Sequence, residues 1–155
     1  MTIRLADAPF AAERELAEFM AGLAGDGAVV SFVGLARPRS SDGERIDRLT
    51  LDSHPRLTLR SLEEIALAAR RRFEISSFRI VHRRGDIAPG EPIVFVAAAA
   101  AHRRAAFEAA DYMMDRLKTD AVFWKREDGE NGARWIEPRG DDYDARERWS
   151  ESCPE

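Results

Sequence analysis

The fold of this chain is decided by the segment Pro92-Ile-Val-Phe-Val-Ala-Ala-Ala-Ala-Ala-His-Arg-Arg104. Its apolar residues predict a strand over 92–99, which leads almost directly into a helix predicted from His102 to Lys118. The apolar run from Ile93 to Ala101 is too short to span a membrane, because a span takes about 20 residues. The predicted helix places its larger apolar side chains on one face, and these are Phe107, Met114 and Leu117.

Segments on both sides of this unit predict further strands. They are expected over 3–5, 28–34, 46–53 and 77–84, with a hairpin formed by 122–127 and 133–138. Two more amphipathic helices are expected, one with Pro9 in its first turn and one after Pro55. The predicted fold class is therefore α+β, with three helices packed on mainly antiparallel strands and a C-terminal hairpin.

Length and composition indicate one globular domain. The 155 residues match the usual size of a single domain, and 45% hydrophobic with 34% charged residues exclude intrinsic disorder. We expect this domain to cover residues 1–140 and a charged, flexible tail to follow over 141–155. The formal net charge is 24 − 28 = −4. This charge argues against a nucleic-acid-binding protein, because neutralisation of phosphates supplies most of that affinity.

The single cysteine, Cys153, is typical of a protein in a reducing compartment. It has no partner for a disulfide within the chain and no second cysteine with which to build a zinc site. The first residues, Met1-Thr-Ile-Arg-Leu-Ala-Asp7, lack the apolar run of a signal peptide. We therefore expect a cytoplasmic protein without membrane contact.

Only two of the 24 basic residues are lysines, namely Lys118 and Lys125. A lysine amine can lose its proton and act as a base or nucleophile, whereas an arginine stays protonated. Lys118 closes the predicted helix beside apolar Leu117, where loss of water would lower its pKa. Lys125 follows in a strand after a short connection, so both amines can converge on one pocket. The competing interpretation is that Lys118 complements the helix C-terminus and that Lys125 is an ordinary surface lysine.

The start of the same helix, at His102 and Arg103, is a candidate anion site. The small residues of 97–101 let a ligand approach the backbone, and a helix N-terminus offers unpaired N–H groups. Basic side chains at this end are mildly unfavourable for the helix, which favours a binding role toward phosphate or carboxylate. The alternative is an ordinary solvated helix start.

Outside these clusters, one loop arginine is a further candidate. Arg37 follows the predicted strand 28–34, in a position where loops commonly carry binding residues. His54 and His82 are expected to be surface or satisfied core histidines, because no Asp or Ser partner pattern accompanies them. The sequence contains no glycine-rich phosphate loop, zinc-binding His-x-Glu motif or serine nucleophile elbow.

Several stretches of the sequence occur together, in this order, in one known family. They are Gly27–Gly34 with Arg37, Ile80–Arg83 with Gly85, Gly90–Val96, Ala101–Arg103 with Ala106–Ala109, Leu117–Thr119, Phe123–Glu127 and Arg134–Glu137. Together they resemble the MoaE family, the large, catalytic subunits of molybdopterin synthase. The resemblance covers about residues 3–140. The family's α/β hammerhead-type fold agrees with the α+β prediction.

The resemblance implies an activity that the residue patterns alone do not. Members of the family convert cyclic pyranopterin monophosphate into the dithiolene of molybdopterin, in molybdenum cofactor biosynthesis. The sulfur arrives as a thiocarboxylate on the C-terminal Gly-Gly of a small ubiquitin-like sulfur-carrier subunit. Two large subunits form a homodimer, with one small subunit at each end of the heterotetramer. The resemblance implies no metal and no organic cofactor for the reaction.

The resemblance also assigns roles to individual residues. Lys118 and Lys125 match the catalytic lysines, and Lys118 is expected to be the indispensable one. An amine can move protons or transiently take the partner's acyl group, and an arginine can do neither at neutral pH. The remaining site residues are Arg37, His102 and Arg103 for substrate binding, Arg126 and Glu127 beside the pocket, and Arg139, which is expected to reach a neighbouring subunit's site.

Departures from the family pattern leave a second function open. They are Asp120 and Val122 after the Lys-Thr pair, Leu35, and Asp52-Ser-His54. An acidic Asp120 near Lys118 is expected to hold that amine charged and so to oppose a nucleophilic role. The alternative function is a non-catalytic anion- or peptide-tail-binding module on the same scaffold, which would capture the partner's tail.

Overall fold

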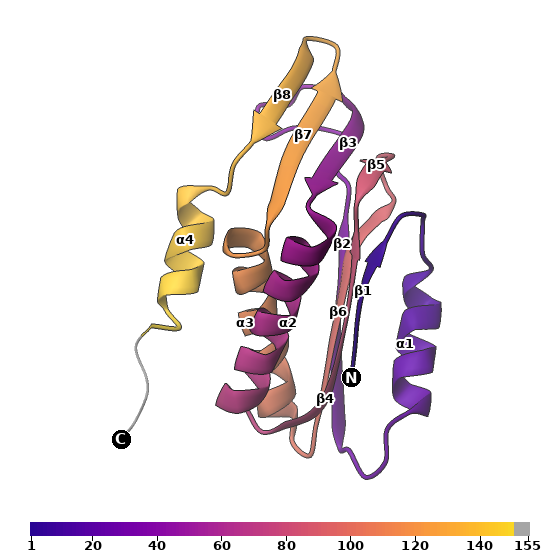
Figure 1. Cartoon of the computed structure of the whole chain (residues 1–155), viewed down its shortest axis with the longest axis vertical. Helices are drawn as coiled ribbons and strands as arrows, with labels where there is room; N and C mark the ends of the chain where they lie inside the picture. The colour runs from indigo at the N-terminus through magenta and orange to yellow at the C-terminus, as the bar shows by residue number, and fades with distance from the viewer. Residues whose placement is uncertain (151–155) are drawn as a thin grey trace.

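Eight strands form two four-stranded sheets, which Figure 1 shows end to end along the molecule. The computed structural model describes residues 1–150, so Cys153 lies outside the described residues. The strands are β1 (Thr2–Ala6), β2 (Ala28–Leu35), β3 (Ile46–Ser53), β4 (Ile75–Arg83), β5 (Gly85–Ile87), β6 (Pro92–Ala100), β7 (Phe123–Gly129) and β8 (Gly132–Ile136). The first sheet has the order β1-β4-β6-β2, and the second has the order β5-β3-β7-β8.

Strand β6 is the buried centre of the first sheet. Every residue from Val94 to Ala100 is at most 5% exposed, which explains why this part of the sequence is a continuous apolar run rather than an alternating one. β6 pairs antiparallel with β4 and β2, and β1 joins β4 in parallel. β2 and β1 are therefore the edges of this sheet.

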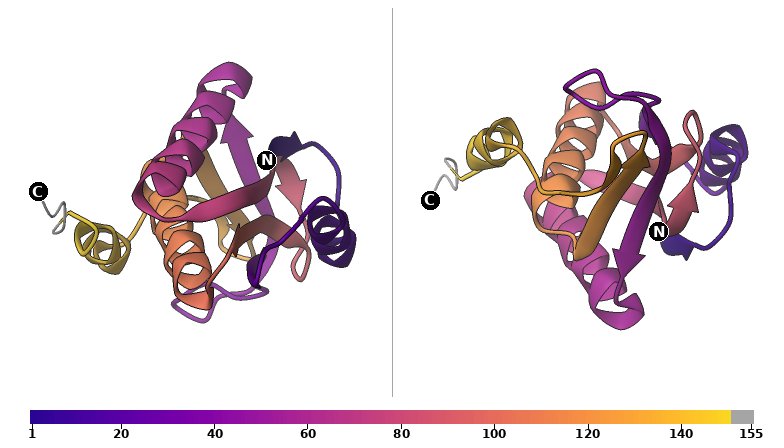
Figure 2. Two further views of the ribbon diagram at one scale, coloured as in Figure 1. Left: turned by 90° about the horizontal axis from the view of Figure 1, so that it is seen from below. Right: turned by 90° about the horizontal axis from the view of Figure 1, so that it is seen from above.

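Helices cover both faces of the first sheet, as the two views of Figure 2 show. Helices α2 (Pro55–Arg72) and α3 (Arg103–Thr119) pack on one face, and α1 (Ala12–Ala21) packs on the other. α2 begins as predicted, because His54 accepts a hydrogen bond from the Leu57 N–H at 3.3 Å and caps the helix. α1 begins three residues later than the prediction from Pro9.

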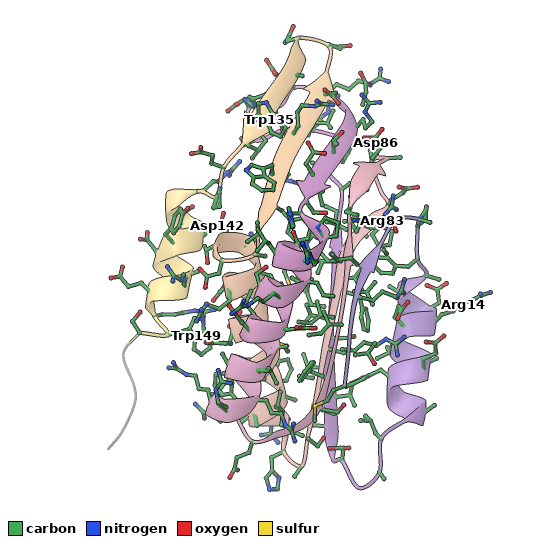
Figure 3. The ribbon with its side chains drawn as sticks, viewed as in Figure 1. Arg14, Arg83, Asp86, Trp135, Asp142 and Trp149 are labelled. Carbon is green, nitrogen blue, oxygen red and sulfur yellow. The ribbon has the colours of Figure 1, made fainter. Side chains whose placement is uncertain are left out.

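The prediction of three helices was incomplete, because a fourth helix, α4 (Gly140–Glu147), packs beside α3. Few apolar side chains hold it in place. Arg146 pairs with Asp120 at 3.0 Å, and the Trp149 indole donates to Asp115 at 2.7 Å. The ring of Trp149, labelled in Figure 3, also packs edge-on against Tyr112, with centroids 5.5 Å apart. The domain boundary at residue 140 stays a prediction.

The second sheet is antiparallel throughout, and in it β7, which carries Lys125 and Glu127, lies between β3 and β8. The predicted C-terminal hairpin is present as β7 and β8, whereas the three-residue strand β5 was not predicted. Phe123, at the start of β7, packs against the cores of both sheets. The α+β class with a C-terminal hairpin is therefore confirmed.

Candidate functional site

A pocket of about 920 Å³ opens where the two sheets meet the end of α3 and the start of α4. Its floor is apolar and buried, and includes Leu51, Val94 and Leu117. Its rim is charged and more exposed, and includes Arg37 and Arg139. A cavity of this size with a few converging polar groups is a typical site for a small ligand.

Both lysines of the chain line this pocket, Lys118 from the last turn of α3 and Lys125 from β7. Lys118 Nζ lies 2.9 Å from Asp142 Oδ1, and Lys125 Nζ lies 3.9 Å from Glu127 Oε1. Alternation along β7 places Lys125 and Glu127 on the pocket side. Two amines from separate elements thus face one cavity.

The two lysines differ in their exposure to water. The sequence predicted that Lys118 would be the desolvated one, and the structure shows the opposite. The Lys118 side chain is 58% exposed and ion-paired, so it is not the desolvated lysine. The Lys125 side chain is 35% exposed. Burial lowers the pKa of Lys125, Glu127 opposes this effect, and the positive charges of Arg37, Lys118 and Arg139 lower the pKa further. Lys125 therefore releases its proton more readily than a lysine in water does.

We expect Lys125→Met to raise the melting temperature at pH 7 slightly. Between its lowered folded pKa and its ordinary value of 10.5, the unfolded chain binds more protons at Lys125 than the folded chain does. Charging this amine therefore destabilises the fold near neutral pH, and the penalty disappears as the pH rises through that window. The gain is on the order of 1–2 °C, because water screens a side chain that is one-third exposed.

Thermal unfolding of both proteins at pH 7 and at pH 10.5 checks this expectation. The difference in melting temperature should shrink at the higher pH. A variant that melts several degrees below the wild-type chain at pH 7 would mean that Lys125 stabilises the fold.

The sequence led us to expect the carboxylate of Asp120 beside Lys118. In the structure the carboxylate beside Lys118 is that of Asp142, at the start of α4. Figure 3 shows it beside the end of α3. Its carboxylate accepts from the Arg139 N–H at 3.0 Å and from Lys118. Although burial opposes the effect, these two donors lower the pKa of Asp142. Asp120 instead pairs with Arg116 and Arg146, so it does not hold the amine of Lys118.

Arg37, Glu127 and Arg139 also line the pocket. Arg139 was predicted to reach a neighbouring subunit's site, and in this structure it faces the pocket of its own chain. Arg126 lies on the opposite side of β7 and is not a lining residue, and its guanidinium stacks over Trp135 at 5.7 Å. Several residues that line the pocket received no site role from the sequence, among them His82, Arg134, Asp142 and Tyr143.

His102 and Arg103 do not join this pocket. They stand at the first end of α3, whereas Lys118 stands at the last, and a helix of this length separates them by about 24 Å. Both side chains are exposed, and neither has a hydrogen-bond or ion-pair partner within residues 1–150. Two groups that the sequence predicted for one substrate therefore lie far apart in a single chain.

Among residues 1–150, no group of three or more His, Cys, Asp or Glu side chains is arranged to hold a metal ion. No helix of the described part has the length and apolar character needed to cross a membrane.

Comparison with known proteins agrees with the fold. The family described as MoaE protein matches residues 5–120. The molybdopterin synthase catalytic subunit of Caulobacter vibrioides is 47% identical over 153 residues, which cover 99% of this chain and 100% of that protein. The molybdopterin biosynthesis MoaE protein from Burkholderia ambifaria has a similar structure, with a TM-score of 0.81, 38% identity and coverage of 97% and 99%.

The fold also extends to a more distant structure. One chain in the protein–protein complex of subunits 1 and 2 of the molybdopterin-converting factor from Helicobacter pylori has a TM-score of 0.73 at 19% identity, with coverage of 88% and 91%. This similarity concerns the fold alone. The family match and the identity over nearly the whole chain show that this chain belongs to the MoaE protein family.

Proposed function

We propose that this chain is the catalytic subunit of a molybdopterin synthase and acts as a sulfurtransferase. It would convert cyclic pyranopterin monophosphate into the molybdopterin dithiolene. The observation that carries the proposal is that the only two lysines, on separate elements, line one pocket together with Arg37 and Arg139. The high identity to a molybdopterin synthase catalytic subunit supports it.

The charges of the pocket suit this chemistry. Arg37, Arg139 and Lys118 lie at the exposed rim, where they would hold the cyclic phosphate and stabilise negative charge that develops during sulfur attack. Burial lowers the pKa of Lys125, which favours proton transfer from this amine. Lys118 and Lys125 are the proposed catalytic residues, with Lys118 the indispensable one.

The sulfur would come from the thiocarboxylated Gly-Gly tail of a small ubiquitin-like subunit. The pocket is open to solvent and its rim is cationic, so it can admit an anionic chain end. The protein of this fold from Helicobacter pylori occurs in a complex of two subunits, which supports a two-subunit assembly here.

A homodimer explains how His102 and Arg103 could serve the same substrate. β2 is an edge strand, and it exposes the apolar side chains of Phe32, Val33 and Leu35. Its first residue, Ala28, pairs with Ala100 near the start of α3, and its last residue lines the pocket. β2 is about 26 Å long, close to the length of α3.

Two-fold antiparallel pairing of β2 with a second copy would therefore place the start of one β2 beside the end of the other. The start of the partner's α3 would then lie next to the pocket. We propose that His102 and Arg103 complete the site of the neighbouring copy in this way.

The direct test mixes the purified chain with thiocarboxylated small subunit and cyclic pyranopterin monophosphate and assays for the dithiolene pterin. Product formation that requires the lysines is the expected result. No product, together with binding of the small subunit's tail that survives the loss of both lysines, would instead support a non-catalytic tail-binding module.

We expect Asp142→Asn to strengthen binding of an anionic ligand by about 2- to 5-fold. Removal of the carboxylate charge frees the amine of Lys118, and an exposed ion pair is worth up to about 1 kcal/mol. The amide oxygen can still accept from the Arg139 N–H, so the helix start is preserved.

Titration of the variant with cyclic pyranopterin monophosphate measures this effect. Asp144→Asn is the matched control, since it makes the same charge change on α4 at a residue that does not line the pocket. Equal affinity changes in the two variants would mean that the ion pair with Lys118 has no role.

A further inference from the structure

His82 occupies an unusual place for a histidine, in the buried floor of the pocket. It lies near the end of β4 and is 8% exposed. Its ring stacks on Phe123, with centroids 4.1 Å apart and planes inclined by 22°. The lysines and arginines discussed above stand at the more exposed rim, whereas His82 lies opposite the apolar lining residue Val94 on the neighbouring strand.

The hydrogen bond of the ring determines its tautomer. Nδ1 lies 2.8 Å from the Arg83 carbonyl oxygen, which can only accept, so Nδ1 carries the proton and donates. Burial lowers the pKa of His82 to about 4, although the bond to Arg83 opposes this effect, and the ring is therefore neutral at pH 7. Nε2 consequently bears a free lone pair and acts as an acceptor.

That acceptor has no partner of its own. Within residues 1–150, Nε2 forms no hydrogen bond, and His82 lines the cavity. A phenylalanine would stack on Phe123 equally well without a polar atom. An acceptor without a protein partner, on a residue that is 8% exposed, costs desolvation free energy, which a bound ligand with a suitable donor would offset.

We propose that Nε2 of His82 accepts a hydrogen bond from an N–H group of the substrate's pterin ring and thereby fixes which end of the substrate enters the floor. This proposal rests on the proposed function. A flat heterocycle with N–H donors matches a neutral acceptor in an apolar floor, and the anionic cyclic phosphate matches the cationic rim. A neutral acceptor also disfavours the phosphate or a thiocarboxylate in the floor, since neither presents a donor there.

Nitrogen-15 NMR of the full chain, labelled at histidine, tests the contact directly. The chain has three histidines, and the His82 signals are assigned from a His82→Gln variant. On addition of cyclic pyranopterin monophosphate, the Nε2 signal should move toward that of a hydrogen-bonded acceptor, while Nδ1 stays protonated. His54 is the internal control, because its Nδ1 is engaged at the start of α2.

Substrate affinity gives a second readout. His82→Phe keeps a ring on Phe123 but removes the acceptor, and we expect it to weaken binding of cyclic pyranopterin monophosphate about tenfold. His82→Gln restores a side-chain acceptor and should recover part of this loss. Binding of the small subunit should be the same in both variants.

The outcomes separate this proposal from the proposed function. An Nε2 signal that stays in place while the wild-type chain forms product overturns the role of His82 alone. A signal that moves with the small subunit and not with the pterin also overturns it, because the acceptor then serves the tail. Failure of the wild-type chain to bind the pterin at all overturns both proposals.

Discussion

Lys118→Ala is expected to lower the rate of dithiolene formation by about 10²- to 10⁴-fold, the range that a positioned proton-transfer group contributes. The stability of the fold should change by less than about 0.5 kcal/mol, because the side chain is 58% exposed and its one ion pair lies at the surface. The measurement is a single-turnover assay with thiocarboxylated small subunit, accompanied by thermal unfolding of the same samples.

The Lys118→Arg variant distinguishes a requirement for proton transfer from a requirement for positive charge alone. Arginine keeps the positive charge and a partner for Asp142, but it does not give up a proton at neutral pH. We therefore expect this variant to be nearly as inactive as the alanine variant. Arg60→Ala is the control, because it removes an exposed helical cation with an acidic neighbour that does not line the pocket. An active Lys118→Arg protein would show that charge alone suffices.

Strand β6 and helix α3 could be predicted because the sequence pattern that indicates each of them lies within the element itself. The apolar run of β6 and the spacing of apolar residues in α3 each indicate their own structure within a short window. The hairpin of β7 and β8 was predictable from the Asp128-Gly-Glu-Asn-Gly132 turn for the same reason.

Helix α4 could not be predicted in this way. Its face toward α3 is polar, and the contacts that hold its segment join residues far apart in sequence, such as Lys118 with Asp142 and Arg148 with Asp115. Each partner alone is an ordinary surface charge. Only the tertiary arrangement shows that the positions are complementary.

The site was predictable in its lysines but not in its surroundings. Rarity of lysine and a short connection placed Lys118 and Lys125 near each other, whereas nothing local distinguished His82 from an ordinary core histidine. By contrast, the separation of His102 from Lys118 could have been predicted from the sequence. At 1.5 Å per residue, the length of the predicted helix already excludes one common site within a single chain.

The separation of His102 and Arg103 from Lys118 leads to a second prediction with a large expected effect on activity. A Lys118→Ala chain and a His102→Ala/Arg103→Ala chain should each be nearly inactive alone, and a mixture of the two should regain activity. In a mixed dimer, one site combines both defects, and the other combines an intact pocket with intact His102 and Arg103 from the neighbouring copy. With free exchange at a 1:1 ratio, half of the dimers are mixed, so about one quarter of all sites are intact.

A control mixture decides whether the recovery has this cause. Lys118→Ala and Lys125→Ala alter the same pocket, so no mixed dimer of these two chains contains an intact site, and this mixture should stay inactive. If the first mixture is active and the second is not, His102 and Arg103 must act on the neighbouring copy's pocket. If both mixtures stay inactive while the chains exchange, each chain must build its site alone. The distance along α3 then removes His102 and Arg103 from substrate binding.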